Sequence, residues 1–435
     1  MTSAQIPVFH PGTKLYRFTI LIFISLLSLG SYFAYDIIKA IVDDIMQALQ
    51  VNQDKMGWIN SMYSFAAIPA LFFGGYLLDK IGTRKASLIF SSFVVIGATI
   101  VAFSKTVLLI SIGRFLFGAG SETVIVAQST ILARWFKGRE LALAFGITLT
   151  VSRLGSLFAF NTGAVIRDQY GGPFYALLAA AIICGISLLA NFVYIIMDRR
   201  GEKVLNLRDE STEEKINWKD IKFLTPSFWY ISAICVAFYS AIFPFQTLAP
   251  DFFQAKWNIP DLVSHSGSFL YKVFFNMIHL FKTSGGMTSI IIFASMIFAP
   301  FAGRWVDKYG KRATVMIVGS VLMIPAHMLM GLTHLSPVPM MIVLGAAFVM
   351  VPASMWPSIP LVVKQERVGT AFGLMAAIQN IGLFMFDNLN GQLRVLTGDY
   401  TASQLMFASL GIVGLVFSIL LIKSDQKAGS LLEKP

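Results

Sequence analysis

Charged residues are scarce in this chain: Asp, Glu, Lys and Arg make up only 13% of its 435 residues, whereas 56% are hydrophobic. A soluble protein normally carries about twice that charged fraction. Together with a mean hydropathy of +0.70, this composition excludes a soluble globular protein and indicates a polytopic membrane protein. The formal net charge of +11 does not predict nucleic-acid binding, because the basic residues lie between apolar stretches, as in cytoplasmic loops.

Other absences narrow the function. The two cysteines, Cys184 and Cys235, lie in apolar runs without CxxC or metal-ligand spacing, so we expect small buried residues and no metal site. The chain has no GK[ST] phosphate-binding loop of an ATP-driven pump, and no HExxH or GxSxG element of a hydrolase. We therefore predict neither an enzyme nor a cofactor. We expect no cleavable secretory signal, and the sequence contains no Asn-x-Ser/Thr sequon.

Twelve apolar stretches are present, each near the roughly 20 residues that a helix needs to cross a bilayer. The longest polar segment, 198–225, divides them six and six. We predict an all-α integral membrane protein with a lead at 1–13, six-helix halves at 14–197 and 226–422, a linker at 198–225 and a tail at 423–435. The stretches fall at roughly 16–39, 56–78, 84–103, 107–133, 140–163, 174–197, 227–250, 286–306, 312–333, 338–363, 368–391 and 402–422.

Lysine and arginine concentrate on alternate loops, which predicts the orientation of the chain. The other loops hold only scattered cations such as Lys55, Lys105 and Arg167. With twelve spans, this alternation places both termini in the cytoplasm. The basic loops contain Lys80, Arg84 and Lys85; Arg134, Lys137 and Arg139; Arg199 and Arg200 of the linker; Lys308, Lys311 and Arg312; and Lys364 and Arg367.

The extracellular segment 251–285 is much longer than the matching loop at 40–55. Leu270, Phe274 and Ile278 follow helical spacing within it. One interpretation is a short helix in the membrane interface or over the extracellular mouth. The other is a continuation of the eighth span.

One loop motif occurs twice in the sequence. Residues 75–85 read GYLLDKIGTRK and residues 303–312 read GRWVDKYGKR, each between two apolar stretches. Glycine allows close helix packing, the aspartate can pair with a neighbouring helix N-terminus, and the cations anchor the turn. This loop resembles the signature of the major facilitator superfamily. The resemblance implies a gating role for Asp79, Arg84, Asp307 and Arg312, without substrate contact.

Two ionisable residues lie at membrane depth, where the cost of burying a charge makes each a functional candidate. Glu122 is about eleven residues from the basic end of its span, or roughly 17 Å, and Arg153 is about thirteen residues from its own, or roughly 20 Å. A buried structural ion pair is one interpretation. The other is that both face a central cavity and bind the opposite charges of a zwitterion, since an arginine fork fits a carboxylate.

Further candidates surround this pair. Arg114 lies in an Arg-x-x-x-Gly-x-Gly pattern that resembles the fourth span of the same superfamily. Arg114, Asp36 and Asp387 are candidates for proton coupling, and Arg114 is also explained by a structural role. Polar and aromatic residues that complete a pocket are Tyr35, Tyr63, Gln128, Trp356, Gln379 and Asn380.

Several motifs resemble one branch of the superfamily, the animal lysosomal dipeptide uniporters. They run through nearly the whole transmembrane region: 30–36, 114–122, 135–141, 153–156, 243–245, 356–357, 369–373 and 378–382. The resemblance implies movement of dipeptides down their gradient. It also implies that Glu122 and Arg153 bind the two termini of the peptide.

This sequence departs from that branch in its longer segment 251–285, in Asp387, and in lacking an acidic dileucine signal. We therefore predict a prokaryotic relative in a cell membrane rather than a lysosomal one. Its expected partners are dipeptides or other small zwitterions and the lipid bilayer. Two alternatives remain: a proton-coupled transporter or antiporter of organic anions or drugs, and a non-transporting receptor or scaffold.

Overall fold

The computed structural model describes residues 9–136, 140–205, 218–263, 267–364 and 367–434. This part of the chain contains twelve helices that are long and apolar enough to cross a membrane, as the sequence predicts. They are α1 (Lys14–Ala40), α3 (Gln53–Ile81), α4 (Thr83–Phe103), α5 (Val107–Phe136), α6 (Leu141–Tyr170), α7 (Pro173–Leu205), α8 (Pro226–Trp257), α10 (Ser284–Tyr309), α11 (Arg312–Leu332), α12 (Pro337–Val362), α13 (Val368–Thr397) and α14 (Thr401–Lys427).

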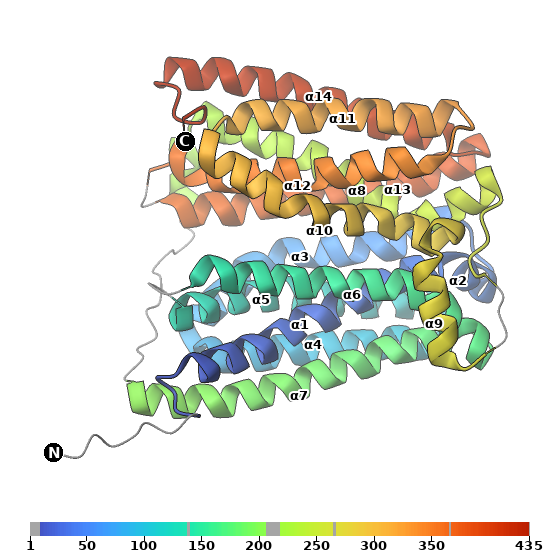
Figure 1. Cartoon of the computed structure of the whole chain (residues 1–435), viewed down its shortest axis with the longest axis horizontal. Helices are drawn as coiled ribbons and strands as arrows, with labels where there is room; N and C mark the ends of the chain where they lie inside the picture. Colours follow the sequence, from blue (N-terminus) through green and yellow to red (C-terminus); the bar gives the residue numbers. More distant parts are fainter. Residues whose placement is uncertain (1–8, 137–139, 206–217, 264–266, 365–366, 435) are drawn as a thin grey trace.

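The helices form two bundles that lie side by side (Figure 1). The first half contains α1 and α3–α7, and the second contains α8 and α10–α14. The start of α1 and the end of α14 lie at the same end of the molecule, which we call the termini end. Between the halves, α3 packs against α13 and α6 packs against α10.

At the opposite end, the halves touch through their backbones. A Cβ atom at Gly57 in α3 would collide with the carbonyl oxygen of Asp387 in α13, and one at Gly391 would collide with that of Gln53. Glycine is needed at such positions because helices in lipid gain stability from close packing. Side chains add to the contact, as Gln53 donates a hydrogen bond to Asp251 over 3.0 Å. We call this the sealed end.

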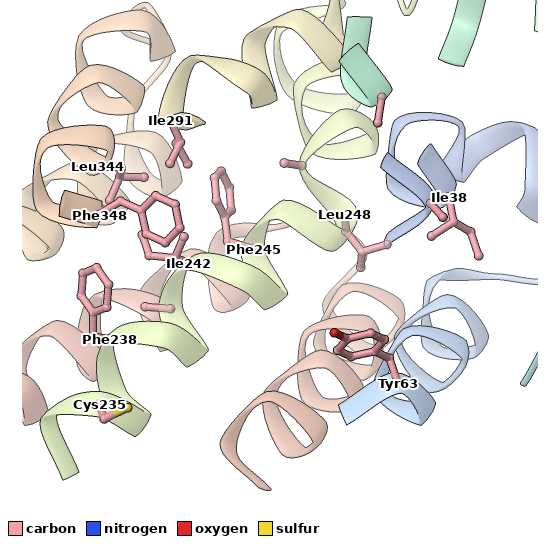
Figure 2. Packing of buried hydrophobic residues seen from close by; sticks show 14 of the residues in the cluster. Ile38, Tyr63, Cys235, Phe238, Ile242, Phe245, Leu248, Ile291, Leu344 and Phe348 are labelled. Atoms are coloured by element: carbon pink, nitrogen blue, oxygen red, sulfur yellow. The ribbon is translucent and has the colours of Figure 1, made fainter. Parts of the chain in front are cut away.

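The apolar core is continuous across the two halves. Figure 2 shows Phe245 and Leu248 of α8 between Ile291 of α10 on one side and Ile38 and Tyr63 of the first half on the other. Lipid tails are as apolar as these side chains, so the helices are held together mainly by van der Waals packing. Polar side chains between the halves are therefore exceptions in an apolar core, and they are candidates for a functional site.

Two short helices lie at the sealed end (Figure 1). α2 (Val42–Leu49) falls where the sequence predicted only a loop, because eight residues are too few to carry a clear periodicity. α9 (Phe269–Ile278) confirms the predicted short helix in segment 251–285. It is separated from α10 by a 3-10 turn at Leu280–Lys282, so the alternative of a continuous eighth span is wrong.

Several helices extend beyond their predicted ends, among them α7 and α8. α8 continues to Trp257, into segment 251–285. α7 continues to Leu205, so the first eight residues of the predicted linker are helical. In α7 the reason is electrostatic: Asp198 is buried and accepts hydrogen bonds from Arg84, over 2.6 Å, and from Arg134. A paired carboxylate therefore prolongs the helix past its apolar residues.

Candidate functional site

Glu122 and Arg153 lie at similar depth in consecutive antiparallel helices. Glu122 is fourteen residues before the end of α5, and Arg153 is twelve residues after the start of α6. At about 1.5 Å per residue, these positions are roughly 21 Å and 18 Å from the termini end of each helix. Both side chains are half-buried rather than fully enclosed.

The Glu122 carboxylate is held by a tyrosine. Tyr63 of α3 donates its hydroxyl to Oε1 of Glu122 over 2.7 Å. The Tyr63 ring is fixed in turn by Tyr35 of α1, with ring centroids 4.7 Å apart. A carboxylate can accept about four hydrogen bonds, so one tyrosine positions Glu122 without using up its capacity to bind a cation.

The Arg153 guanidinium reaches from the first half to the second. Its Nη1 donates to the hydroxyl of Ser295 in α10. Its Cζ lies 4.6 Å from the centre of the Phe348 ring in α12, a cation–π contact. An arginine has five N–H donors, so these two contacts orient the group and leave donors for a carboxylate. Arg153 therefore contacts both halves of the molecule.

Glu122 and Arg153 do not neutralise each other. No ion pair joins them among the residues that the structure describes, so the alternative of a permanent buried ion pair is wrong for this structure. Tyr32 of α1 lies within electrostatic reach of both. The arrangement is an acid and a base at similar depth, both near Tyr32 and each able to bind an opposite charge.

Aromatic residues of the second half form one side of this region. Trp356 of α12 donates its indole N–H to the hydroxyl of Tyr239 in α8 over 3.1 Å. Its ring stacks on Phe372 at 6.0 Å, and Tyr239 stacks on Phe243 at 5.7 Å. Phe243 also meets Tyr35 of the first half, with centroids 6.4 Å apart. Tyr239 and Phe243 were not among the predicted pocket residues.

The amide candidates lie in different surroundings. Gln128 is buried, donates to the carbonyl of Ile24 over 2.8 Å and accepts from Ser28, so its contacts favour a packing role. Asn380 is also buried and donates along its own helix to Ala376. Gln379 accepts a weak bond from Cys235 across 3.5 Å. Sequence alone could not separate these cases, because the direction of an amide depends on helix rotation.

The doubled loop behaves differently in the two halves. Arg84 pairs with Asp198 and Glu202 at the end of α7. Arg312 instead donates to the carbonyl of Lys434 over 2.9 Å, in the tail of the chain. The side chains of Asp79 and Asp307 lie outside the described part of the structure.

The three candidates for proton coupling are all buried. Asp36 forms an ion pair of 2.9 Å with Lys39 on the same face of α1. Arg114 donates to Asn60 over 2.9 Å and lies among aromatic rings, and Asp387 accepts from a threonine in α8. Lys39 was missed in the sequence, although its spacing of three residues from Asp36 would have revealed it.

Two bundles of six spanning helices, with an acid and a base at similar depth and the base reaching across to the other bundle, are the arrangement of a membrane transporter of the two-half type. The sequence profile of the Major Facilitator Superfamily matches this chain at residues 24–281 and 262–434. The chain therefore belongs to the Major Facilitator Superfamily, and it is a transporter rather than an enzyme.

Relatives and solved structures agree with this assignment. The lysosomal dipeptide transporter MFSD1 of Danio rerio is 32% identical over 442 residues, covering 98% of this chain and 91% of that protein. The Homo sapiens protein of the same name is 29% identical, covering 96% and 88%. The crystal structure of a mutant of the nucleoside transporter NupG has a TM-score of 0.69 at 14% identity, covering 93% and 99%, a likeness of fold alone.

Proposed function

We propose that this protein moves dipeptides across a membrane by alternating access, as a facilitated uniporter. Arg153 binds the C-terminal carboxylate of the peptide and Glu122 binds its N-terminal ammonium. The observation that carries the proposal is an acid and a base at similar depth that form no ion pair with each other, with Arg153 reaching across to the second half. The names of the relatives at 29–32% identity support the substrate class.

The proposed site predicts that dipeptides with different side chains are accepted. The two charged contacts hold the atoms that all dipeptides share. The aromatic residues around Trp356 and Tyr239 then offer a wall of rings without further charge. Such a wall discriminates weakly, since one methylene in an apolar pocket is worth only about 1–3 kcal/mol. We place the transporter in a cell membrane because the chain lacks an acidic dileucine signal. We orient the termini end toward the cytoplasm on the charge pattern of the loops.

The test is uptake of labelled dipeptides by proteoliposomes containing Glu122→Gln or Arg153→Ala. Each change removes one charge-assisted contact, so we expect uptake at subsaturating dipeptide to fall about tenfold or more. Asp168→Asn and Lys105→Ala remove charges of the same sign at exposed positions and should transport normally. If both site variants transported like the wild type, the site assignment would be wrong.

A second candidate function is proton-coupled transport of organic anions or drugs. The buried Asp36–Lys39 pair and Asp387 favour it, because charges inside a membrane protein often belong to proton pathways. Uptake driven by an imposed pH gradient, and abolished by an ionophore, would support this candidate. Dipeptide uptake that follows only the dipeptide gradient would support the uniporter.

A further inference from the structure

A group of aspartates from both halves meets at the sealed end. Asp44 of α2 lies 3.1 Å from Arg167 of α6. The same arginine pairs with Asp261, in the loop after α8, through its other terminal nitrogen. Arg167 thus compensates one carboxylate from each half and ties them together.

Asp251 of α8 also has hydrogen-bond donors and a cation close to its carboxyl group. Its Oδ2 accepts hydrogen bonds from Gln53, over 3.0 Å, and from the hydroxyl of Tyr400. Arg394 of α13 lies 3.9 Å away. A carboxyl group has about four acceptor positions, so Asp251 can accept one more hydrogen bond besides these.

Asp43 differs from the other three aspartates. It accepts from Gln254 of α8 over 2.5 Å, and the Asp251 carboxyl, three residues earlier in the same helix, lies within hydrogen-bonding reach of it across the interface. No lysine or arginine pairs with it in the described ranges. Two carboxyl groups can share a hydrogen bond only when one of them carries a proton, because a carboxylate is an acceptor alone.

We propose that Asp43 and Asp251 bind one proton between the two halves, and that this proton holds the sealed end closed. The Asp43 O–H donates to the Asp251 carboxylate. When the halves separate at this end, the hydrogen bond breaks and the proton passes to water on that side. The inference goes beyond dipeptide transport, since it concerns the gate and not the substrate.

The electrostatics agree with this geometry. Burial, and then the neighbouring Asp251 carboxylate, raise the pKa of Asp43 from 3.8 to about 8. In the separated state Asp43 is hydrated and its pKa returns toward the ordinary value. Between about pH 4 and pH 8 the closed state therefore binds more protons than the open state, so acidification favours closure by up to about tenfold per pH unit. Above this window neither state is protonated, and the effect ends.

Other charged groups near α2 are already paired or lie on separate elements. α2 packs against α1, α3, α7 and α8. Two ion pairs lie at this end: Asp36 with Lys39, and Asp54 with Lys55 at 3.5 Å. Asp44, Asp261 and Arg167 form the group described above, and Arg394 and Tyr400 contact Asp251. The remaining titratable groups that these helices and their neighbours carry at this end are Tyr175 and Lys256. Within the described part, the carboxyl pair is thus the group whose proton bridges the halves.

The experiment measures opening directly, without substrate. Spin labels on Gln47→Cys in α2 and Ala255→Cys in α8 report the distance between the halves at the sealed end, because both positions are exposed and the native cysteines are buried. In lipid nanodiscs we expect the fraction of molecules with the short label-to-label distance to decrease as pH rises. The ratio of closed to open should fall about tenfold or more between pH 6 and pH 9.

Three variants decide the outcome. In Asp43→Asn the amide donates to Asp251 without a proton, so the distances should no longer depend on pH. Asp251→Asn should also abolish the pH dependence, and it replaces Asp43→Asn in the test if that variant does not fold. Asp44→Asn removes a neighbouring acid that is paired with Arg167 and should keep the wild-type response. A pH response that survives in either pair variant, or no response in the wild type, would overturn the proposal. Neither result bears on whether dipeptides are carried.

Discussion

The residues of this site that could be predicted from the sequence are the charged ones within apolar runs. Glu122 and Arg153 stand out because any charge at membrane depth is costly and needs an explanation. Ser295, Tyr239 and the Asp43–Asp251 pair do not stand out. Their roles come from contacts between residues more than a hundred positions apart, which depend on how the halves pack. The chemical role of a single charged residue was therefore predictable from the sequence, whereas the residues that it contacts in the folded chain were not.

Tyr63 is the residue whose role can be tested most finely. Tyr63→Phe keeps the ring beside Tyr35 but removes the hydroxyl that orients Glu122. A hydrogen bond to a charged group contributes about 1.5–3 kcal/mol, so we expect the KM for dipeptides to rise about tenfold with little change in maximal rate. Initial rates over a range of dipeptide concentrations measure this. Tyr76→Phe, on an exposed position of the same helix, is the control. A wild-type KM in Tyr63→Phe would remove Tyr63 from the site.

At the scale of elements, apolar length was a good guide to the spans and a poor guide to their ends. α7 and α8 both extend past their apolar residues, because side chains at their ends find partners on other helices. α2 is invisible to periodicity because it is too short. α9 was visible because its apolar residues repeat at helical spacing, and those residues remain exposed at the sealed end.

Lys256 shows how such an extension stabilises the second half. Its ammonium donates to the carbonyls of Met330 and Gly331, over 2.5 Å and 2.6 Å, at the end of α11. A cation there satisfies carbonyls that have no partner within the helix and opposes the negative end of its dipole. Lys256→Met should therefore destabilise the protein by about 1–2 kcal/mol.

The measurement is thermal unfolding of the purified protein in detergent, with Lys55→Met as a control at an exposed lysine on α3. We expect the midpoint of Lys256→Met to fall by a few degrees and that of the control to stay within error. An unchanged midpoint in Lys256→Met would mean that water replaces the ammonium on the α11 carbonyls at no cost.

At the scale of the whole molecule, the doubled loop and the six-and-six division predicted the two halves. They did not predict which end is closed, because one sequence encodes every state of an alternating-access cycle. Closure depends on where backbones meet, and only the folded chain displays that. Here the meeting points include Gly57 and Gly391, between α3 and α13, and Gly285 of α10 against α6.

This contact makes a prediction about the cycle. Gly57→Val places a branched side chain against the backbone of Asp387, so the sealed end cannot close fully. Because closure here must alternate with closure at the termini end, we expect the variant to remain open at the sealed end and to lose most dipeptide uptake. Gly185→Val adds the same side chain where a Cβ meets open space and should transport normally. The distance between spin labels on Gln47→Cys and Ala255→Cys should lengthen in Gly57→Val only. A Gly57→Val protein that folds, keeps the short distance and transports normally would show that the backbone contact is not needed for closure.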